Sequence, residues 1–364
     1  MRFFTNKLVV MNSSQSWPNI LGKLLAKSDL SRAEASWAMG QIMSGDSSEA
    51  QIGAFMMALR SKGESVEELA GLVDVMLQHS VILDTGSDAV DIVGTGGDMV
   101  GTVNISTMAS IVAAGAGVPV MKHGSRSASG KTGSSEMLEV LGIRLDLSPE
   151  RVAEIFAEIG LTFFFAPVFH PAMRHVAPIR KALGVPTTFN FLGPLANPAQ
   201  PLATSLGVAN RSIAPLMAAE MAARGRNALV FRGSDGLDEL TTTGNSEIWL
   251  VQGGEVREFT LNPANFGLDT TDLAQLVGGD AHHNADVAKR LLAGERSGNF
   301  AAIRDVVALN AAGGVVAYSL GSNKIETQAD LNAAFASALQ KTFAAIDSGD
   351  AAQKLSDWMA ASQA

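Results

Sequence analysis

The sequence predicts an α/β protein in which a small N-terminal helical domain precedes a larger α/β domain, whose mainly parallel central sheet is flanked by helices. Residues 17–79 carry helical patterns only, whereas beyond residue 84 short apolar runs alternate with helical segments. The chain has 364 residues, 47% of them hydrophobic, which is enough to bury a sizeable core. We expect a flexible N-terminal extension over 1–16, a helical domain over 17–85 and an α/β domain over 86–364.

Composition narrows the possible function classes. The chain has no cysteine, so neither disulfides nor a thiolate zinc site are expected. Its net charge of −9 argues against nucleic-acid binding. Charges or prolines interrupt the apolar runs well before the roughly 18 residues of a membrane span, so we expect no membrane segment. Residues 1–16 lack the apolar region and cleavage site of a signal peptide, and Met11 is an alternative start. These features predict a cytoplasmic enzyme.

Helix start signals recur at regular intervals in the helical domain. They are the capping boxes Ser31-x-x-Glu34, Ser48-x-x-Gln51 and Ser65-x-x-Glu68. After the second box, a helical stripe is widened into a broader apolar surface by Ala54, Met57 and Ala58. Such a surface fits packing on a second copy of the chain, and it fits burial against the chain's own second domain equally well.

The α/β region begins with short apolar runs that predict strands. They cover residues 90–93, 118–121, 161–165, 204–208, 228–231 and 248–251. Between them, Ser148-Pro149 opens a helix, with serine as the cap and proline in the first turn. Residues 167–178 are expected to form a loop that enters a helix bearing Arg180, and some helices around 170–200 are expected to pack on the helical domain. From Asp280 onward the pattern is helical again.

The stretch from Asp91 to Ser106 predicts a strand, a glycine turn and the start of a helix. Gly94, Gly96 and Gly97 lack a Cβ where the chain must turn sharply, so backbone N–H groups can approach an anion closely. Asn104 or Ser106 can cap the helix that follows. The spacing matches neither a dinucleotide fingerprint nor a P-loop. Two interpretations remain open: a phosphate-binding turn of another type, or a plain tight turn between strand and helix.

A second strand, loop and helix unit contains Lys122-His-Gly-Ser-Arg-Ser-Ala-Ser-Gly-Lys131. Its cations, hydroxyl side chains and glycines are the donors that surround phosphate oxygens. A solvated basic loop is the alternative. Acidic residues are absent between Asp98 and Glu136 and again between Glu158 and Glu220. These two gaps hold the cations Lys122, Arg126, Lys131, Arg174, Arg180, Lys181 and Arg211. Concentrated positive charge in an acidic protein indicates a pocket for polyanionic or carboxylate ligands.

The segment Asp235-Gly-Leu-Asp-Glu239 follows the apolar run 228–231 and supplies the carboxylates that the basic loops lack. Asp238 and Glu239 can bind Mg²⁺, which takes a few carboxylates together with substrate phosphates. Paired acids are more often surface residues when they occur alone. Here they accompany two phosphate-type loops, which favours a metal site.

Together these motifs resemble the anthranilate phosphoribosyltransferase family over nearly the whole chain. The matching motifs are Gly-Thr-Gly-Gly-Asp at 94–98, Asn-x-Ser-Thr at 104–107, Lys-His-Gly-x-Arg at 122–126, Leu-Gly-Pro-Leu-x-Asn-Pro at 192–198 and Asp-Gly-Leu-Asp-Glu at 235–239. The resemblance implies transfer of the phosphoribosyl group from 5-phosphoribosyl 1-pyrophosphate to the amine of anthranilate, the second step of tryptophan biosynthesis from chorismate. It also implies a homodimer formed through the helical domain.

The resemblance also implies roles for individual residues. Those implied to bind phosphoribosyl pyrophosphate are Gly94, Gly97, Asp98, Thr102, Asn104, Ile105, Ser106, Thr107, Lys122, His123, Gly124, Ser125, Arg126, Ser127, Ala128, Ser129 and Gly130. Anthranilate would contact Gly94, Ser125 and Arg180. Two Mg²⁺ ions would be held by Ser106, Asp238 and Glu239. Lys122 and Arg126 would act electrostatically in an in-line displacement at ribose C1, and no covalent nucleophile is required.

Several positions depart from the family pattern. The family usually has asparagine at Ser125, a second serine at Gly130 and glycine at Met99, and many members have arginine at Pro186. Ser125 leaves open a transferase that uses another aromatic amine. Two further alternatives are a pyrimidine nucleoside phosphorylase, which has a related fold and phosphate loop, and a nucleic-acid-binding relative without catalysis. The intact 94–98 loop, the Asp238–Glu239 pair and the acidic balance count against the last of these.

Overall fold

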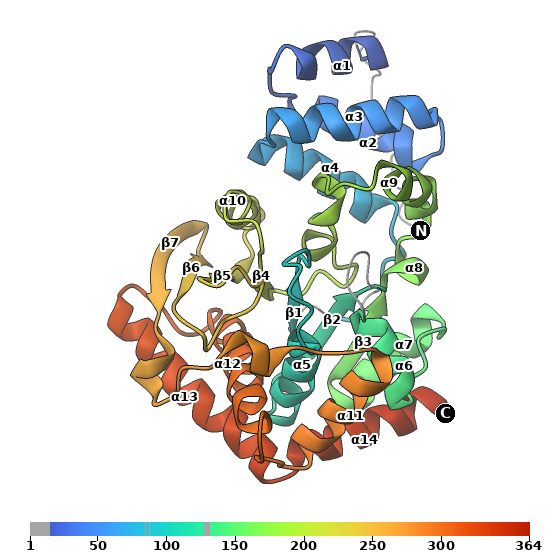
Figure 1. Cartoon of the computed structure of the whole chain (residues 1–364). Helices are drawn as coiled ribbons and strands as arrows, with labels where there is room; N and C mark the ends of the chain where they lie inside the picture. Colours follow the sequence, from blue (N-terminus) through green and yellow to red (C-terminus); the bar gives the residue numbers. More distant parts are fainter. Residues whose placement is uncertain (1–14, 84, 87, 127–131) are drawn as a thin grey trace, which may run out of the picture.

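The computed structural model describes residues 15–83, 85–86, 88–126 and 132–364 (Figure 1). Four helices form the N-terminal part: α1 (Trp17–Leu25), α2 (Arg32–Met43), α3 (Glu49–Lys62) and α4 (Val66–Gln78). The three predicted capping boxes are confirmed. In each, the serine side chain accepts from the third backbone N–H of the helix, and the third side chain accepts from the serine N–H.

A seven-stranded sheet forms the centre of the larger part, in the order β3-β2-β1-β4-β5-β6-β7. The strands are β1 (Val90–Gly94), β2 (Val120–Gly124), β3 (Leu161–Phe165), β4 (Ala203–Gly207), β5 (Asn227–Gly233), β6 (Ser246–Gln252) and β7 (Glu255–Leu261). Strands β1 to β5 run parallel, and β6 and β7 pair antiparallel. The prediction of a mainly parallel sheet is therefore confirmed. Strand β7 was not predicted, because its polar residues alternate along an exposed edge.

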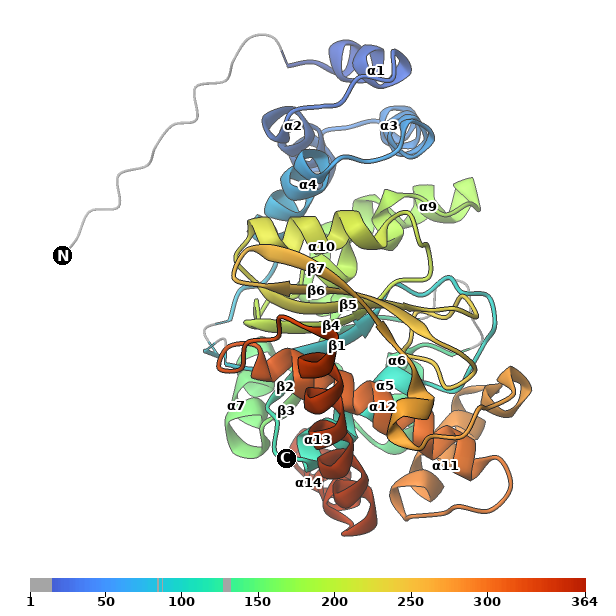
Figure 2. The same ribbon diagram turned by 90° about the vertical axis from the view of Figure 1, so that its left-hand side faces the viewer.

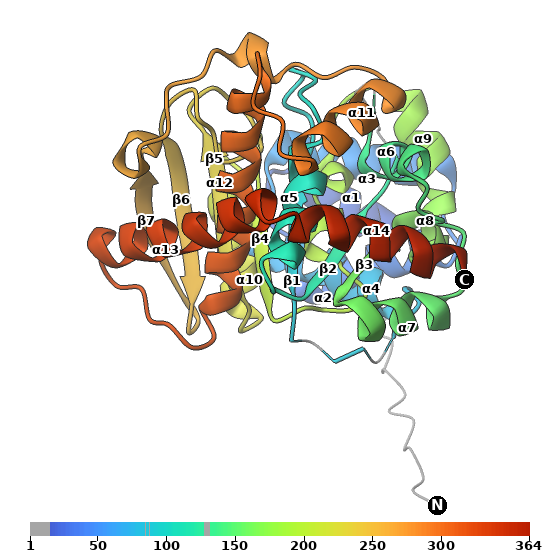
Figure 3. The same ribbon diagram turned by 90° about the horizontal axis from the view of Figure 1, so that it is seen from below.

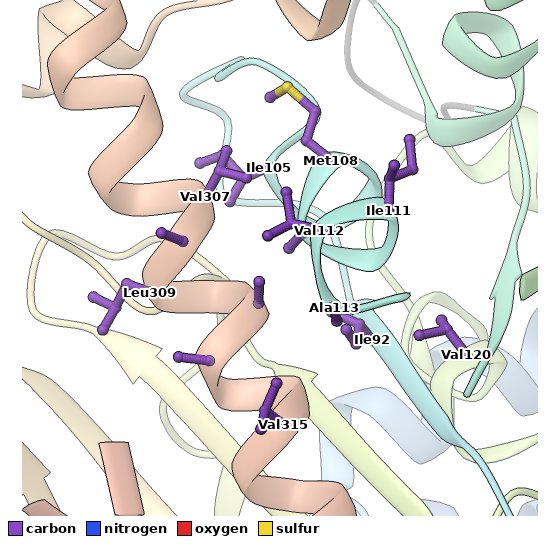
Figure 4. Close-up of a cluster of buried hydrophobic side chains, with 14 of the residues drawn as sticks. Ile92, Ile105, Met108, Ile111, Val112, Ala113, Val120, Val307, Leu309 and Val315 are labelled. Carbon is purple, nitrogen blue, oxygen red and sulfur yellow. The ribbon is translucent and has the colours of Figure 1, made fainter. Parts of the chain in front are cut away.

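Different helices cover the two faces of the sheet (Figure 2). On one face, α10 (Ala214–Ala223) lies between the sheet and the N-terminal helices, and Val93 belongs to this core. On the other face Ile92 joins the larger core. That core is covered by α5 (Ile105–Gly115), α12 (Phe300–Ser319), α13 (Gln328–Asp347) and α14 (Asp350–Gln363), seen from below in Figure 3. Figure 4 shows Ile92 beside Ala113 of α5, and Val307 of α12 beside Ile105 at the start of α5.

The remaining helical elements connect these layers. They are α6 (Ser134–Leu141), α7 (Pro149–Ile159), α8 (Ala166–Phe169), η1 (Pro171–His175), α9 (Ala177–Leu183), η2 (Thr188–Asn190), η3 (Gly193–Leu195), η4 (Pro263–Phe266), η5 (Leu273–Leu276) and α11 (Ala281–Leu292). The expectation of a loop over 167–178 was wrong, because prolines at the start of α8 and η1 fit short helical turns. Helix α9 contacts α3, and Thr188 donates to the buried carboxylate of Glu64 at 2.5 Å.

Helix α12 is long and apolar enough to cross a membrane by length and composition alone. This differs from the expectation that every apolar run is interrupted earlier. In the folded chain 83% of its most apolar window is buried, so its side chains are accounted for by packing on α5, α13 and the sheet.

Two helical glycines give a matched test of the packing between α5 and α14. A Cβ on Gly115 would lie 2.7 Å from Cα and 2.8 Å from the backbone N of Ala351, whereas a Cβ on Gly40 would meet nothing within 4 Å. We expect Gly115→Ala to lower the free energy of unfolding by about 1–3 kcal/mol, because backbone must shift. Gly40→Ala should leave it unchanged or raise it by up to about 1 kcal/mol. Denaturant unfolding measures both, and equal effects would contradict the close approach of the two helices.

Candidate active site

The predicted ligand-binding loops meet at the topological switch point of the sheet, where successive strands are added on opposite sides of β1. Strand β1 lies between β2 and β4, so the loops that follow β1 and β4 leave the sheet beside one another. Gly94 at the end of β1 is paired with Gly207 at the end of β4. Open parallel sheets bind ligands at such a crevice, outside the carboxyl ends of the strands.

The loop after β1 is shaped by residues with positive φ. Gly96, Gly97 and Gly101 have φ values of 68°, 88° and 73°. Met99 also has a φ of 63°, which is uncommon for a residue with a side chain. Successive backbone N–H groups in such conformations can line an anion-binding hollow. The loop leads into the N-terminus of α5, where the helix dipole favours negative charge.

Of the two residues predicted as the cap of α5, Asn104 takes the cap position and Ser106 lies within the helix, but the expected cap through the Asn104 side chain does not form. Its amide group makes no capping hydrogen bond and donates instead to the carbonyl of Thr132 at 3.2 Å. It therefore joins the loop after β1 to the loop after β2. Ser106 lies in the first turn of α5.

Asp238 and Glu239 reach the same loops from the segment after β5. Asp238 Oδ2 accepts from the backbone N–H of Gly96 at 2.6 Å, and Glu239 Oε1 accepts from that of Ser106 at 3.2 Å. A Cβ on Gly94 or on Gly207 would overlap Asp238, so both strand ends need glycine. The acid pair, the glycine turn and the start of α5 thus form one site.

Lys122 lies at the centre of this site with only 2% of its surface exposed. Its ammonium group donates to the carbonyl of Ile92 at 2.6 Å and to Ser106 Oγ at 3.3 Å. Burial lowers the pKa of Lys122, while the charges of Asp91, Glu239 and Asp238 act in the opposite direction. A lysine in this position supplies a fixed donor beside the backbone N–H groups of α5.

Two residues that sequence reasoning did not assign to the site support Lys122 and His123. Asp91 accepts from the backbone N–H of His123 at 3.1 Å and from Asn197 Nδ2 at 2.9 Å. Burial raises the pKa of Asp91 to about 6, although the charge of Lys122 opposes this shift. An aspartate within the apolar run 90–93 was the signal for such a role, because a charge in a buried strand requires partners.

Carboxylates are in excess around Lys122. Burial, then the charge of Asp98, raises the pKa of Asp238 to about 7. Burial and the charge of Asp238 raise the pKa of Glu239 well above its ordinary value. A hard divalent cation would relieve this repulsion, and oxygen ligands suit Mg²⁺. Among the described residues no group of three or more His, Asp or Glu forms a metal cluster. The pair therefore fits a cation whose remaining ligands come from phosphate and water.

His123 is held as a neutral ring. Its Nδ1–H donates to the carbonyl of Gly193 at 3.0 Å, which leaves the buried Nε2 unprotonated and, within the described part of the chain, without a hydrogen-bond partner. Burial, with the neighbouring His170, lowers the pKa of His123 to about 3, and burial lowers that of His170 to about 4. Their ring centroids lie 5.1 Å apart. His123 can thus orient a ligand by accepting a hydrogen bond from it, but it adds no positive charge.

Arg126 and Arg211 do not bring the free positive charge that the acid-free stretches suggested. Arg126 forms two hydrogen bonds to Glu139 at 2.8 and 3.1 Å, and its guanidinium lies 5.7 Å from the ring centre of Phe165. Arg211 pairs with Glu247 on the surface. Sequence gaps in acids could not reveal these pairs, because the partners follow further along the chain. Ser127, Ala128, Ser129, Gly130 and Lys131 lie outside the described residues.

Arg180 differs from these arginines. It lies half-buried on α9, and its guanidinium has no hydrogen bond or ion pair within the described part of the chain. Burial lowers its pKa. A partly buried cation without a partner is poised for an anionic ligand.

Comparison with known proteins gives a full-length match. The chain matches the model for the α/β domain of a glycosyl transferase family over residues 86–352 and the model for that family's helical bundle domain over 18–80. It is 52% identical to the anthranilate phosphoribosyltransferase of Leifsonia xyli, covering 97% of this chain and 100% of the relative. A relative of the same name from Nocardioides is 52% identical, over 95% and 98% of the two chains.

Solved structures agree with these matches. The anthranilate phosphoribosyltransferase of Thermus thermophilus is 38% identical with a TM-score of 0.85, covering 95% of this chain and 99% of the other. That of Saccharomyces cerevisiae, solved in complex with PRPP and Mg, is 29% identical with a TM-score of 0.84, covering 95% and 98%.

Replacing Asp91 by asparagine tests the support beneath the site. An amide cannot accept hydrogen bonds with both of its atoms, so the N–H of His123 or that of Asn197 loses its acceptor. We expect Asp91→Asn to lower the free energy of unfolding by about 1–3 kcal/mol. Asp46→Asn, an exposed control, should change it by less than about 0.5 kcal/mol. Unfolding in urea measures both, and an unchanged Asp91→Asn protein would contradict the role of this carboxylate.

Proposed function

Because the chain belongs to the anthranilate phosphoribosyltransferase family, we propose that the crevice between β1 and β4 is its active site. The enzyme transfers the phosphoribosyl group of 5-phosphoribosyl 1-pyrophosphate to anthranilate, which yields N-(5-phosphoribosyl)anthranilate and pyrophosphate in tryptophan biosynthesis. The similarity to anthranilate phosphoribosyltransferases favours this reaction over the two alternatives, nucleoside phosphorolysis and nucleic-acid binding. The observation that carries the proposal is the joining of Asp238 and Glu239 to the glycine turn and to α5.

We propose that the donor lies across the two basic and glycine-containing loops. Its diphosphate would contact the backbone N–H groups of residues 94–98 and the first turn of α5. Thr102, Asn104, Thr107 and the loop from Lys122 to Gly130 would complete its binding site. The positive φ values at Gly96 and Gly97 support this placement, because successive N–H groups in such conformations can line an anion-binding hollow.

Mg²⁺ is the cofactor, and we propose that Ser106, Asp238 and Glu239 hold as many as two ions together with the diphosphate. When bound, Mg²⁺ would neutralise the negative charge that builds up on the departing pyrophosphate. The raised pKa values of Asp238 and Glu239 support this role, because buried carboxylates that repel each other gain from a shared cation.

We propose that the anthranilate carboxylate pairs with Arg180, and that Gly94 and Ser125 line the acceptor position. The unpartnered guanidinium supports this role for Arg180. Ser125 is exposed at the start of the loop after β2. His123 Nε2, unprotonated, is available to accept a hydrogen bond from a ligand N–H.

In the reaction, these side chains bind and orient the reactants. Lys122, fixed on Ile92 and Ser106, stabilises negative charge on the leaving oxygens, and the N–H groups at the start of α5 act with it. Arg126 can add to this stabilisation after leaving Glu139. Arg180 would hold the amine in line with ribose C1, and such positioning accounts for a large part of the rate increase. No covalent nucleophile takes part.

We further propose a cytoplasmic homodimer in which residues 17–85 form the dimerisation domain and residues 86–364 the donor-binding domain. Apolar side chains on the surface of the helical domain support the dimer: Leu25, the last residue of α1, is 76% exposed and Met57 on α3 is 38% exposed. Such side chains gain from burial against a second copy of the same surface.

The reaction can be followed by the fluorescence of anthranilate after enzyme, Mg²⁺ and phosphoribosyl pyrophosphate are mixed. We expect a Mg²⁺-dependent loss of fluorescence in the wild type. An Asp238→Ala/Glu239→Ala protein should lose at least about 10²-fold in rate, because charge on the leaving group is no longer neutralised. A Glu255→Ala/Glu258→Ala protein, altered on the exposed strand β7, is the matched control and should retain the wild-type rate.

Two other outcomes would change the proposal. If fluorescence persists while the wild type still binds the donor, the acceptor is another aromatic amine, and Ser125 becomes the position to vary. If the double variant retains the wild-type rate, the metal assignment is wrong.

The raised pKa of Asp238, about 7, predicts competition between protons and Mg²⁺. Below this pH the carboxyl is protonated in the metal-free enzyme and must lose its proton when Mg²⁺ binds. We expect the half-saturating Mg²⁺ concentration to rise about fivefold from pH 7 to pH 6 and to change little above pH 8. Asp238→Asn should lack this component, while effects of pH on the donor itself are common to both proteins. Identical pH profiles would contradict the assignment.

A further inference from the structure

A segment far along the sequence crosses the two donor loops. The residues between η5 and α11 run beside the loop after β1, where Val103 N–H donates to the carbonyl of Leu276 at 2.9 Å and Gly278 N–H donates to that of Gly101 at 2.9 Å. Thr102 and Val277 form an antiparallel bridge between these bonds. The approach is close enough that a Cβ on Gly278 would overlap the carbonyl of Thr102.

A closed ring of hydrogen bonds lies at the end of this crossing. Asn284 Nδ2 donates to Asn104 Oδ1 at 2.8 Å, and Asn104 Nδ2 donates to the carbonyl of Thr132 at 3.2 Å. Thr132 Oγ1 donates to the carbonyl of Gly279 at 3.0 Å, and Gly279 N–H donates back to Asn284 Oδ1 at 2.8 Å. Each amide has one orientation here, because Gly279 N–H requires an oxygen and the Thr132 carbonyl requires a donor.

Asn284 is the buried corner of this ring, with 1% of its surface exposed. It belongs to the first turns of α11, whereas Asn104 precedes α5 and Thr132 precedes α6. The ring therefore fixes the distance between the starts of two helices whose loops have been assigned to the same donor. If Asn284 is shortened, Asn104 loses the bond that aligns its amide with Thr132, and Gly279 N–H loses its buried acceptor.

We propose that Asn284 is a positioning residue for phosphoribosyl pyrophosphate: it acts through Asn104 and Thr132 to hold the two donor loops at a fixed separation. The inference rests on the proposed function, since it uses the assignment of both loops to the donor. Holding both loops in place before binding reduces the ordering that the donor must induce, so the effect falls on donor affinity. The acceptor side, with Arg180 on α9, lies outside the ring.

The test compares steady-state kinetics of the wild type, Asn284→Ala and a matched control at saturating Mg²⁺. We expect Asn284→Ala to raise the KM for phosphoribosyl pyrophosphate about tenfold, with kcat within about threefold and an unchanged KM for anthranilate. The control is Thr342→Val. Thr342 is also buried and donates to the carbonyls of Ala308 and Leu339 at 3.1 Å each, but it lies on α13 away from the loops. Thr342→Val should lose stability without a change in either KM.

A double-mutant cycle adds a readout that a general loss of stability would not produce. Thr132→Val breaks the same ring at its hydroxyl and should raise the donor KM by itself. The two changes together should raise it by less than the product of the separate effects, because either one opens the ring. Multiplicative effects, or an Asn284→Ala protein with an unchanged donor KM, would overturn the positioning role. If the wild type itself does not turn over anthranilate, the proposed function fails instead.

Discussion

The buried ammonium group of Lys122 faces more carboxylates than it can neutralise. Asp91, Asp238 and Glu239 all act on its charge, and burial raises the pKa of each of these acids. The acids cannot move apart, because backbone or amide N–H groups fix each of them. The site therefore concentrates buried carboxyl groups, whose ionisation is costly, around one fixed cation. A magnesium diphosphate suits this arrangement, because it brings two positive charges to the acids and phosphate oxygens to the lysine and the α5 N-terminus.

The sheet makes this concentration of charge possible. Adjacent parallel strands end at the same level, so the loops after β1, β2 and β5 can each bring polar groups to one edge while hydrophobic side chains fill both faces behind them. The absence of a Cβ at Gly94 and Gly207 lets Asp238 lie directly against the strand ends. The same two glycines would be weak positions in an ordinary strand. Glycine is needed at both positions here because a Cβ at either one would overlap Asp238.

Much of the fold and of the site could be predicted from local sequence signals. The features that could not be predicted depend on contacts between residues far apart in the chain. The serine capping boxes depend on residues three apart, and the strands of the buried sheet are continuous apolar runs, so both could be predicted from sequence. The pairing of Arg126 with Glu139 and the bond from Asn104 to Thr132 depend on how loops fold back, which spacing does not encode. Asp91 was recognisable in the sequence as a charged residue within a predicted strand. Its hydrogen-bond partner Asn197 could not be predicted, because it lies over a hundred residues later in the chain.

Neutral amides hold the loops that carry the charges. Asn197 holds Asp91, Asn284 joins the donor loops, and Asn310 of α12 clamps Leu240, the residue after Glu239. Asn310 Oδ1 accepts from the N–H of Leu240 at 2.9 Å, and its Nδ2 donates to the carbonyl of the same residue at 2.8 Å. A carboxylate in such a place would raise the pKa values of the acids further, and an ammonium group would compete with Mg²⁺ for them. An amide offers one donor side and one acceptor side without a net charge. The positions of the loops can therefore be fixed independently of the electrostatic balance on which donor binding depends.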